Sequence, residues 1–296
     1  MKIRSKNYMN KDVNSLPFYK LQASGNDFIL IDNQKLTFKT TQLKKIARVI
    51  CRRRFGAGGD GLLVIEPSSK RDFKMRIFNP DGTEAEMCGN GARCAALWAG
   101  LELKTKDKNL SFETKAGVIR AQVSAKKTSV QVKIKMNTPS RLKLNIPVKV
   151  LGRTIKVNYI NTGVPHTVIF VEGLDKIDVE SLGRTIRFHK KFKPEGTNVD
   201  FVEVLAKDYI KIRTYERGVE AETLACGTGI AAGAIITSCR LGVNSCQLTV
   251  KVLTKSGEVL KVYLNKKEDC VENVWLEGKA CLVYKGEFLT REVRDV

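Results

Sequence analysis

The sequence predicts an α+β protein with two pseudo-symmetric lobes, each a curled mixed or antiparallel sheet around a central helix. Segments of the first half recur in the second half at a nearly constant spacing, which indicates two homologous lobes. Each half also contains many short strand-like runs and only about two helical stretches, which favours a sheet that wraps around its helix. The length of 296 residues agrees with two domains of ordinary size.

The repeat is clearest in a Cys-Gly-x-Gly loop that leads into a run of small apolar residues. One copy begins at Cys88 and the other at Cys226, 138 positions later. Three further pairs of segments keep nearly this spacing: 73–79 with 210–216 at 137, 25–31 with 163–169 at 138, and, more loosely, 60–65 with 198–203 at 138. One match would be chance, whereas four in register predict two lobes.

The elements follow the same order in both halves. A glycine-containing loop leads into a short apolar strand, two further strands follow, and the Cys-Gly-x-Gly loop then begins a helix. The expected strands lie at 28–31, 62–65 and 73–78 in the first half and at 167–171, 201–205 and 210–215 in the second. Alternating patterns predict strands at 130–136 and 248–253, and a helical stretch is expected at 40–51.

The lobes are expected at 17–133 and 134–282, after a loose tail at 1–16. A last strand-like run near Ala280 could return to either lobe, so residues 283–296 are a candidate for completing the first. The basic N-terminal stretch lacks the apolar core of a secretory signal, and no apolar run reaches the ~18 residues of a membrane span. A cytoplasmic location without membrane attachment is therefore expected.

The net charge of +21 raises the alternative of a nucleic-acid-binding protein. The basic residues are spread along the whole chain, and there is no zinc-finger spacing or long basic block beyond residues 52–54. A solvated basic surface is therefore the favoured interpretation, and no nucleic-acid partner is expected.

The eight cysteines include no Cys-x-x-Cys pair, and the chain has only two histidines. A zinc or iron–sulfur site is therefore poorly supported, and no metal is expected. Without a secretory signal, free thiols are favoured over disulfides. Most of the cysteines, Cys94 among them, are interpreted as small core residues, and Cys88 and Cys226 are the exceptions.

A cysteine at a helix start lies beside free backbone N–H groups, which favour negative charge. We therefore expect a lowered thiol pKa at Cys88 and Cys226, and an anion cradle beside each. Two such thiols facing one cleft suit stereoinversion at a carbon acid, in which one removes a proton and the other delivers one, with no cofactor. A redox switch that joins the two cysteines is the alternative, but it leaves the paired cradles unexplained.

Together these motifs resemble the diaminopimelate epimerase family. The matching segments occur in the family's order at 24–32, 54–63, 78–94, 163–166, 195–199, 215–218 and 226–229. The resemblance implies the family's fold and the cofactor-independent interconversion of LL- and meso-2,6-diaminopimelate, in lysine and peptidoglycan-precursor biosynthesis. It implies diaminopimelate as the small-molecule partner, and a homodimer is expected on this basis alone.

The resemblance also implies roles for single residues. Cys88 matches the cysteine usually called the proton donor and Cys226 the acceptor, although these labels depend on the direction of reaction. His166 and Glu216 resemble residues that tune the thiol pKa values, and Arg217 is expected to take a distal carboxylate bidentately. The substrate-binding positions are Asn26, Asn79, Gly89, Asn90, Asn198, Glu216, Arg217, Gly227 and Thr228.

The chain departs from the family pattern at three places. Val164 stands where some members have Asn, Gly61 stands where some have Gln, and the segment from Glu216 to Cys226 is one residue longer. A substrate hydrogen bond at position 164 would be lost or supplied elsewhere, so positions 164 and 61 are not counted as site residues.

Two related classes remain as rivals within the fold. Proline and hydroxyproline racemases resemble this chain in fold and in paired thiols, but Glu216, Arg217 and the Asn26 loop suit a substrate with a second amino-acid centre better. Phenazine-type isomerases lack the thiol pair, so Cys88 and Cys226 argue against them.

Overall fold

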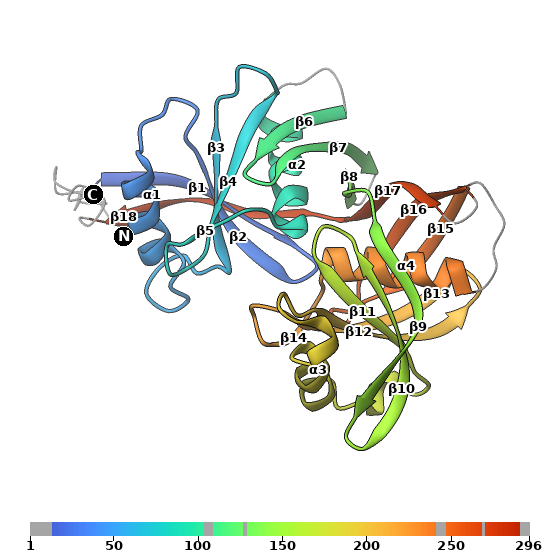
Figure 1. Cartoon of the computed structure of the whole chain (residues 1–296). Helices are drawn as coiled ribbons and strands as arrows, with labels where there is room; N and C mark the ends of the chain where they lie inside the picture. Colours follow the sequence, from blue (N-terminus) through green and yellow to red (C-terminus); the bar gives the residue numbers. More distant parts are fainter. Residues whose placement is uncertain (1–13, 104–108, 127–128, 241–246, 268–269, 291–296) are drawn as a thin grey trace, which may run out of the picture.

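The computed structural model describes residues 14–103, 109–126, 129–240, 247–267 and 270–290. The chain forms two lobes, the first drawn in blue to green and the second in yellow-green to orange (Figure 1). The last strand, in red, runs from the junction back across the first lobe. Within the described ranges, no helix is long and apolar enough to cross a membrane.

The same order of elements occurs in each lobe. The first lobe contains β1 (Asn14–Ala23), β2 (Asn26–Asp32), α1 (Thr40–Ile50), β3 (Gly61–Glu66), β4 (Phe73–Phe78), β5 (Glu84–Ala85), α2 (Gly89–Glu102), β6 (Asn109–Thr114), β7 (Gly117–Lys126) and β8 (Ser129–Lys135). The second contains β9 (Ser140–Val150), β10 (Arg153–Asn161), β11 (Pro165–Phe170), α3 (Val179–Arg187), β12 (Asn198–Ala206), β13 (Tyr209–Glu216), β14 (Ala221–Thr223), α4 (Gly227–Arg240), β15 (Gln247–Leu253), β16 (Val259–Lys267) and β17 (Cys270–Lys279). Strand β18 (Cys281–Thr290) follows β17 and returns to the first lobe.

Strand pairing repeats from lobe to lobe. In the first lobe β2 is parallel to β3, β3 is antiparallel to β4, and β4 is parallel to β6, which continues through the antiparallel strands β7 and β8. The second lobe has the same pattern from β11 through β12, β13, β15 and β16 to β17. Strand β18 flanks β1 as β9 flanks β10, so the equivalence extends to the edge strands.

The lobes are joined by the antiparallel pair β8 and β17, which are equivalent strands of the two halves. Ile134 and Leu276 lie opposite each other in this pair. A Cβ added to Gly89, the residue after Cys88, would lie 3.8 Å from Ile134. A Cβ added to Gly227, the residue after Cys226, would lie 3.3 Å from Leu276. The first turns of both helices therefore pack against apolar side chains of the β8–β17 pair, at the junction of the lobes.

The helices α2 and α4 are buried inside the curled sheets because small and apolar residues occur all around them. Ten consecutive residues of α2, from Asn90 to Ala99, are buried, and α4 is buried from Gly229 to Ser238. Helices α1 and α3 instead bury one apolar face each. Helix α3 was not predicted from the sequence, although Asp178 caps its N-terminus and its buried residues Val179, Gly183 and Ile186 have helical spacing.

Several boundaries differ from those predicted. Strand β1 begins at Asn14, so residues 14–16 belong to the sheet and not to a tail, while residues 1–13 lie outside the described ranges. Strand β8 crosses the predicted division at 133 and 134, because its pairing with β17 continues to Lys135. The returning strand begins at Cys281 rather than at residue 283, and it pairs with β1 of the first lobe.

The loosest of the four repeat alignments is displaced by one residue. Phe28 pairs with Gly61, whereas the equivalent His166 pairs with Asn198. Position 61 therefore corresponds to 198 at an offset of 137, and not 138. With this correction, the first-lobe residue equivalent to Asp200 is Leu63.

Candidate active site

Each of the two matched cysteines lies at the start of a central helix. Cys88 is the N-cap of α2 in an extended conformation, and its carbonyl accepts the amide of Ala92 at 2.8 Å. Cys226 precedes α4, and its carbonyl accepts the amide of Ile230 at 2.9 Å. Free amides of the first turn point toward each sulfur, as the sequence predicted.

The two cysteine loops contact each other across the lobes. The side-chain amide of Asn90 donates to the carbonyl of Ala225, the residue before Cys226, at 3.5 Å. Glu216 lies close enough to raise the pKa of both thiols by charge repulsion. Cys88 and Cys226 therefore share one electrostatic site.

The predicted lowering of the thiol pKa values is wrong for this structure. Burial raises the pKa of Cys88, and burial together with Glu216 and Asp200 raises the pKa of Cys226 well above its usual value. The helix-start amides act in the expected direction at both sulfurs, but desolvation of the thiolate outweighs them. A thiolate at this site therefore needs a positive charge beside it.

Around Cys88, the side chain of Asn26 is fixed by three partners. Its Oδ1 accepts from the Cys88 thiol at 3.7 Å and from Asn90 Nδ2 at 3.3 Å, while its Nδ2 donates to Asp60 at 2.7 Å. Asp60 thereby orients the amide so that its oxygen faces the sulfur. Asp60 was not predicted from the sequence to be part of the site.

A buried guanidinium lies on α2 beyond Cys88. Arg93 has no exposed surface, and its terminal nitrogens donate to Ser24 at 2.9 Å, to Asn90 at 2.5 Å and to the carbonyl of Lys279 at 3.3 Å. Ser24 in turn donates to Glu258 of the second lobe at 2.5 Å. Burial lowers the pKa of Arg93, while its charge lowers that of Cys88. This cation was also missed from the sequence.

Around Cys226, a chain of hydrogen bonds leads into the core of the second lobe. The sulfur lies 3.4 Å from Thr228 Oγ1, which lies 2.9 Å from His166 Nε2. His166 Nδ1 lies 2.7 Å from Asp200, and both side chains are fully buried. Thr162 supports this loop by donating to the carbonyl of Thr228 at 2.9 Å.

Asn198 and Arg217 form a second arm of the site. Asn198 is buried, and its Oδ1 accepts from the backbone amide of Arg217 at 2.8 Å. The guanidinium of Arg217 donates to the carbonyl of Glu195 at 3.0 Å. Burial raises the pKa of the neighbouring Glu216. Asn198 thus links the His166 region to the segment that carries Glu216 and Arg217.

Asn79 is placed differently from the other predicted residues. It is exposed in the turn between β4 and β5, where its side-chain amide donates to Thr83 at 2.9 Å. Its backbone amide donates to the carbonyl of the same Thr83 at 2.8 Å. The geometry found for Asn79 is that of a turn residue.

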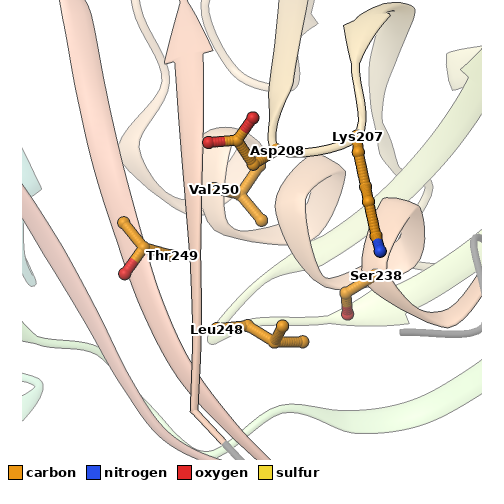
Figure 2. Close-up of a pocket in the computed structure, with 6 residues that line it drawn as sticks. All are labelled: Lys207, Asp208, Ser238, Leu248, Thr249 and Val250. Carbon is orange, nitrogen blue, oxygen red and sulfur yellow. The ribbon is translucent and has the colours of Figure 1, made fainter. Parts of the chain in front are cut away.

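Two further features lie outside this arrangement. A cavity of about 180 Å³ lies between the β12–β13 turn, the C-terminal part of α4 and β15, lined by Lys207, Asp208, Ser238, Leu248, Thr249 and Val250 (Figure 2). It contains none of the predicted site residues. In the part of the chain that the structure describes, no group of three or more His, Cys, Asp or Glu residues could hold a metal ion.

Solved structures of low sequence identity share this fold. A phenazine biosynthesis protein of the PhzF family from Bacillus anthracis aligns with a TM-score of 0.71 at 18% identity, over 93% of this chain and 99% of that one. A hydroxyproline epimerase from Agrobacterium vitis aligns with a TM-score of 0.64 at 14% identity, over 95% and 93%. These likenesses confirm the two-lobed fold class. The shared architecture defines the class of fold to which the chain belongs, with two homologous lobes that each enclose a central helix.

Close relatives identify the family. The family profile of diaminopimelate epimerase matches residues 18–142 and 158–281. The diaminopimelate epimerase of Aquifex aeolicus is 43% identical, over 95% of this chain and all of that protein, and that of Methanothrix thermoacetophila is 42% identical, over 93% and 96%. The chain belongs to the diaminopimelate epimerase family, which confirms the resemblance seen in the sequence.

Proposed function

We propose that Cys88 and Cys226 are the two acid–base groups of a stereoinversion at an α-carbon, one from each lobe. As a diaminopimelate epimerase, the protein is an amino-acid isomerase of lysine biosynthesis. The substrate on this proposal is 2,6-diaminopimelate, converted between its LL and meso forms. The supporting observation is that the two thiols occupy equivalent helix starts and that Glu216 acts on both.

In the forward step an ionised thiol removes the α-proton, so that the C–H bond breaks, an S–H bond forms and the electron pair stays on the carbon. The opposite thiol then gives its proton to the other face of the carbon, and in reverse the roles exchange. The amides of Gly89, Asn90, Gly227 and Thr228 would hold the α-carboxylate and stabilise the charge that develops on it.

Because the pKa values of both thiols are raised, a thiolate at this site has to be stabilised by a neighbouring positive charge. A thiolate buried beside Glu216 is unfavourable unless a cation lies near it. Arg93 supplies one such charge on the side of Cys88, and the α-ammonium group of the substrate would supply another. Binding and ionisation are therefore coupled, because the substrate stabilises the thiolate that attacks it.

The remaining predicted residues would orient the two amino-acid centres. Asn26 and Asn198 present amide groups on the first and second lobe, and Arg217 would pair with the distal carboxylate. This assignment favours diaminopimelate over proline, which has no second centre. Asn79 stays a prediction as a substrate-binding residue.

The test is incubation of the reduced protein with LL-diaminopimelate in D₂O without added cofactor. A two-base mechanism predicts that the first meso product carries deuterium at the inverted carbon, while unreacted LL substrate carries little deuterium. Deuterium accumulating equally in both would indicate a single base. Proline serves as the control substrate, and inversion of proline instead would favour the racemase alternative.

Two variants test the thiols separately. Cys88→Ala and Cys226→Ala should each abolish epimerisation, while circular dichroism shows an intact fold. Full activity of either variant would contradict the two-base mechanism. A redox switch would instead predict loss of both free thiols on mild oxidation without any exchange of the α-proton under reducing conditions.

The homodimer and the cytoplasmic location stay predictions. Sedimentation equilibrium of the purified chain tests the first, and cell fractionation tests the second.

A further inference from the structure

The second lobe holds a buried polar cluster beside the first turn of α4. His166 and Asp200 have no exposed surface, and Thr214 is 3% exposed. Thr214 donates to Asp200 Oδ1 at 2.8 Å, and Asp200 Oδ2 lies 2.7 Å from His166 Nδ1. The cluster packs against Gly229, where an added Cβ would lie 3.2 Å from Asp200 Cγ and 3.3 Å from His166 Cε1.

The equivalent place in the first lobe is wholly apolar. There an added Cβ on Gly91 would lie 3.1 Å from Leu63 and 3.5 Å from Ile77. Strand pairing and the helix starts make Phe28 equivalent to His166, Leu63 to Asp200, Ile77 to Thr214 and Gly91 to Gly229. The same backbone thus surrounds an apolar trio in one lobe and a polar trio in the other.

The two lobes show whether packing requires polar side chains at these three positions. The first lobe shows that the fold is satisfied by three apolar side chains at these positions. Burying a carboxylate and an imidazole costs free energy that their mutual hydrogen bonds only offset, so such pairs seldom add net stability. The polar trio is therefore better explained by the chemistry of the second lobe than by its packing.

The surroundings of His166 determine which nitrogen carries the proton. Asn198 Nδ2 donates to the carbonyl of Pro165 at 3.0 Å, and its Oδ1 accepts the amide of Arg217 at 2.8 Å, so both ends of the amide are fixed by backbone groups. Its Nδ2 then faces His166 Nε2 at 3.5 Å. Because an N–H group faces Nε2, this nitrogen is the acceptor, and Nδ1 donates to Asp200.

We propose that Asp200 is a positioning residue for epimerisation, which holds His166 with Nδ1–H toward its carboxylate and so presents Nε2 as an acceptor to Thr228 and, through it, to Cys226. The proposal rests on the two-thiol function given above. Sequence reasoning assigned a tuning role to His166 but none to Asp200 or Thr214.

The arrangement provides a path for one proton. When Cys226 ionises, its S–H proton passes to Thr228 Oγ1 while the hydroxyl proton of Thr228 passes to His166 Nε2. The products are a thiolate and an imidazolium whose Nδ1–H remains bonded to Asp200. The charged groups that face His166 are Asp200 on β12 and Glu216 on β13, and both stabilise the imidazolium. Cys88 has no equivalent path, because Phe28 stands at the position that His166 occupies in the second lobe.

The test is Asp200→Asn, which keeps the shape and can still accept from Thr214 but presents an N–H group to Nδ1. His166 should then switch to the Nε2–H tautomer, which can no longer accept from Thr228. We expect kcat to fall by about 10²–10⁴-fold with KM changed by less than threefold, the scale expected for a catalytic histidine in the wrong tautomer.

Two readouts separate positioning from structure. The chain has only two histidines, so nitrogen NMR of labelled protein, with His189→Gln for assignment, reports the tautomer of His166 directly. Carboxymethylation of each cysteine as a function of pH, followed by peptide mass spectrometry, should change at Cys226 and stay unchanged at Cys88. An Nε2–H tautomer in the unmodified protein, near-normal kcat in the variant, or equal changes at both cysteines would overturn the proposal.

The triple variant His166→Phe, Asp200→Leu and Thr214→Ile is the matched control, because it copies all three apolar side chains of the first lobe. It should fold with unchanged or higher stability and yet be inactive, whereas a purely structural role predicts that it retains activity. If the unmodified protein does not exchange the α-proton of LL-diaminopimelate, the proposed function fails, while the tautomer measurement still shows whether Asp200 holds His166 with Nδ1–H toward its carboxylate.

Discussion

Replacing Gly229 by alanine adds one methyl group at the most crowded point of the second lobe. The new Cβ would lie 3.2 Å from Asp200 Cγ and closer still to its Oδ1. Asp200 cannot withdraw, because Thr214 and His166 hold its two oxygens at 2.8 and 2.7 Å. Gly91→Ala is the natural control, since its Cβ would lie 3.1 Å from a terminal methyl of Leu63, which can turn away.

The expected magnitudes follow from these contacts. Alanine gains about 1 kcal/mol over glycine in a helix at both positions. At Gly229 this gain is opposed by about 1–3 kcal/mol of overpacking and by a similar weakening of the buried hydrogen bonds of Asp200. We therefore expect Gly229→Ala to lower the free energy of unfolding by ~3 kcal/mol and Gly91→Ala to change it by less than ~1 kcal/mol.

Urea unfolding followed by tryptophan fluorescence and circular dichroism measures both variants under the same conditions. At roughly 2 °C per kcal/mol for a chain of this size, the melting temperatures should differ by about 4–8 °C. Equal stability of the two variants, or a greater loss for Gly91→Ala, would refute the reasoning that a fixed carboxylate and a mobile methyl distinguish the two glycines.

The remaining predictions concern the charges around the thiols. Because both thiol pKa values are raised, carboxymethylation should be slow at neutral pH and accelerate above pH ~9. Cys88 should react before Cys226, because the charge of Arg93 favours the Cys88 thiolate. The reverse order of reaction would contradict this electrostatic difference between the two thiols. Glu216→Gln removes a repulsive charge and should move both alkylation profiles to lower pH, and an unchanged profile at either cysteine would show that the carboxylate does not act there. Gly278→Ala places a methyl against the buried guanidinium of Arg93, so urea unfolding should show a loss of about 1–3 kcal/mol. Wild-type stability would mean that this guanidinium is free to move.

Local sequence signals predicted much of the first turn at each cysteine. A Cys-Gly-x-Gly loop before small apolar residues predicted a helix start, and Cys88 is the N-cap of α2. The same local reasoning gave the wrong direction for the thiol pKa, because it counted the helix amides and not the burial supplied by the other elements. Helix α3 had a readable signal in Asp178 and its spacing, whereas no local pattern separates a turn role for Asn79 from a substrate contact.

The repeat could also have indicated Asp200 in advance. Asp200 is a charged residue in a strand that is buried throughout from Asn198 to Val202, at the place where the first half has Leu63. The alignment displaced by one residue placed Asp200 opposite Leu62, so it showed the same contrast in residue type but compared Asp200 with the wrong leucine. Because adjacent strand residues point to opposite faces, an error of one position compares a core residue with one from the wrong face.

The sequence by itself determined that the chain has two homologous lobes, each with a thiol at a helix start. Each repeated segment is a short contiguous run of residues, so its pattern can be recognised without knowing the tertiary structure. Only the tertiary structure decided that β18 completes the first lobe and that β8 and β17 join the halves. It also decided that both thiols are harder to ionise than a free cysteine and that Asp200 holds His166. These outcomes depend on desolvation and on hydrogen bonds between residues distant in sequence, which no local pattern encodes.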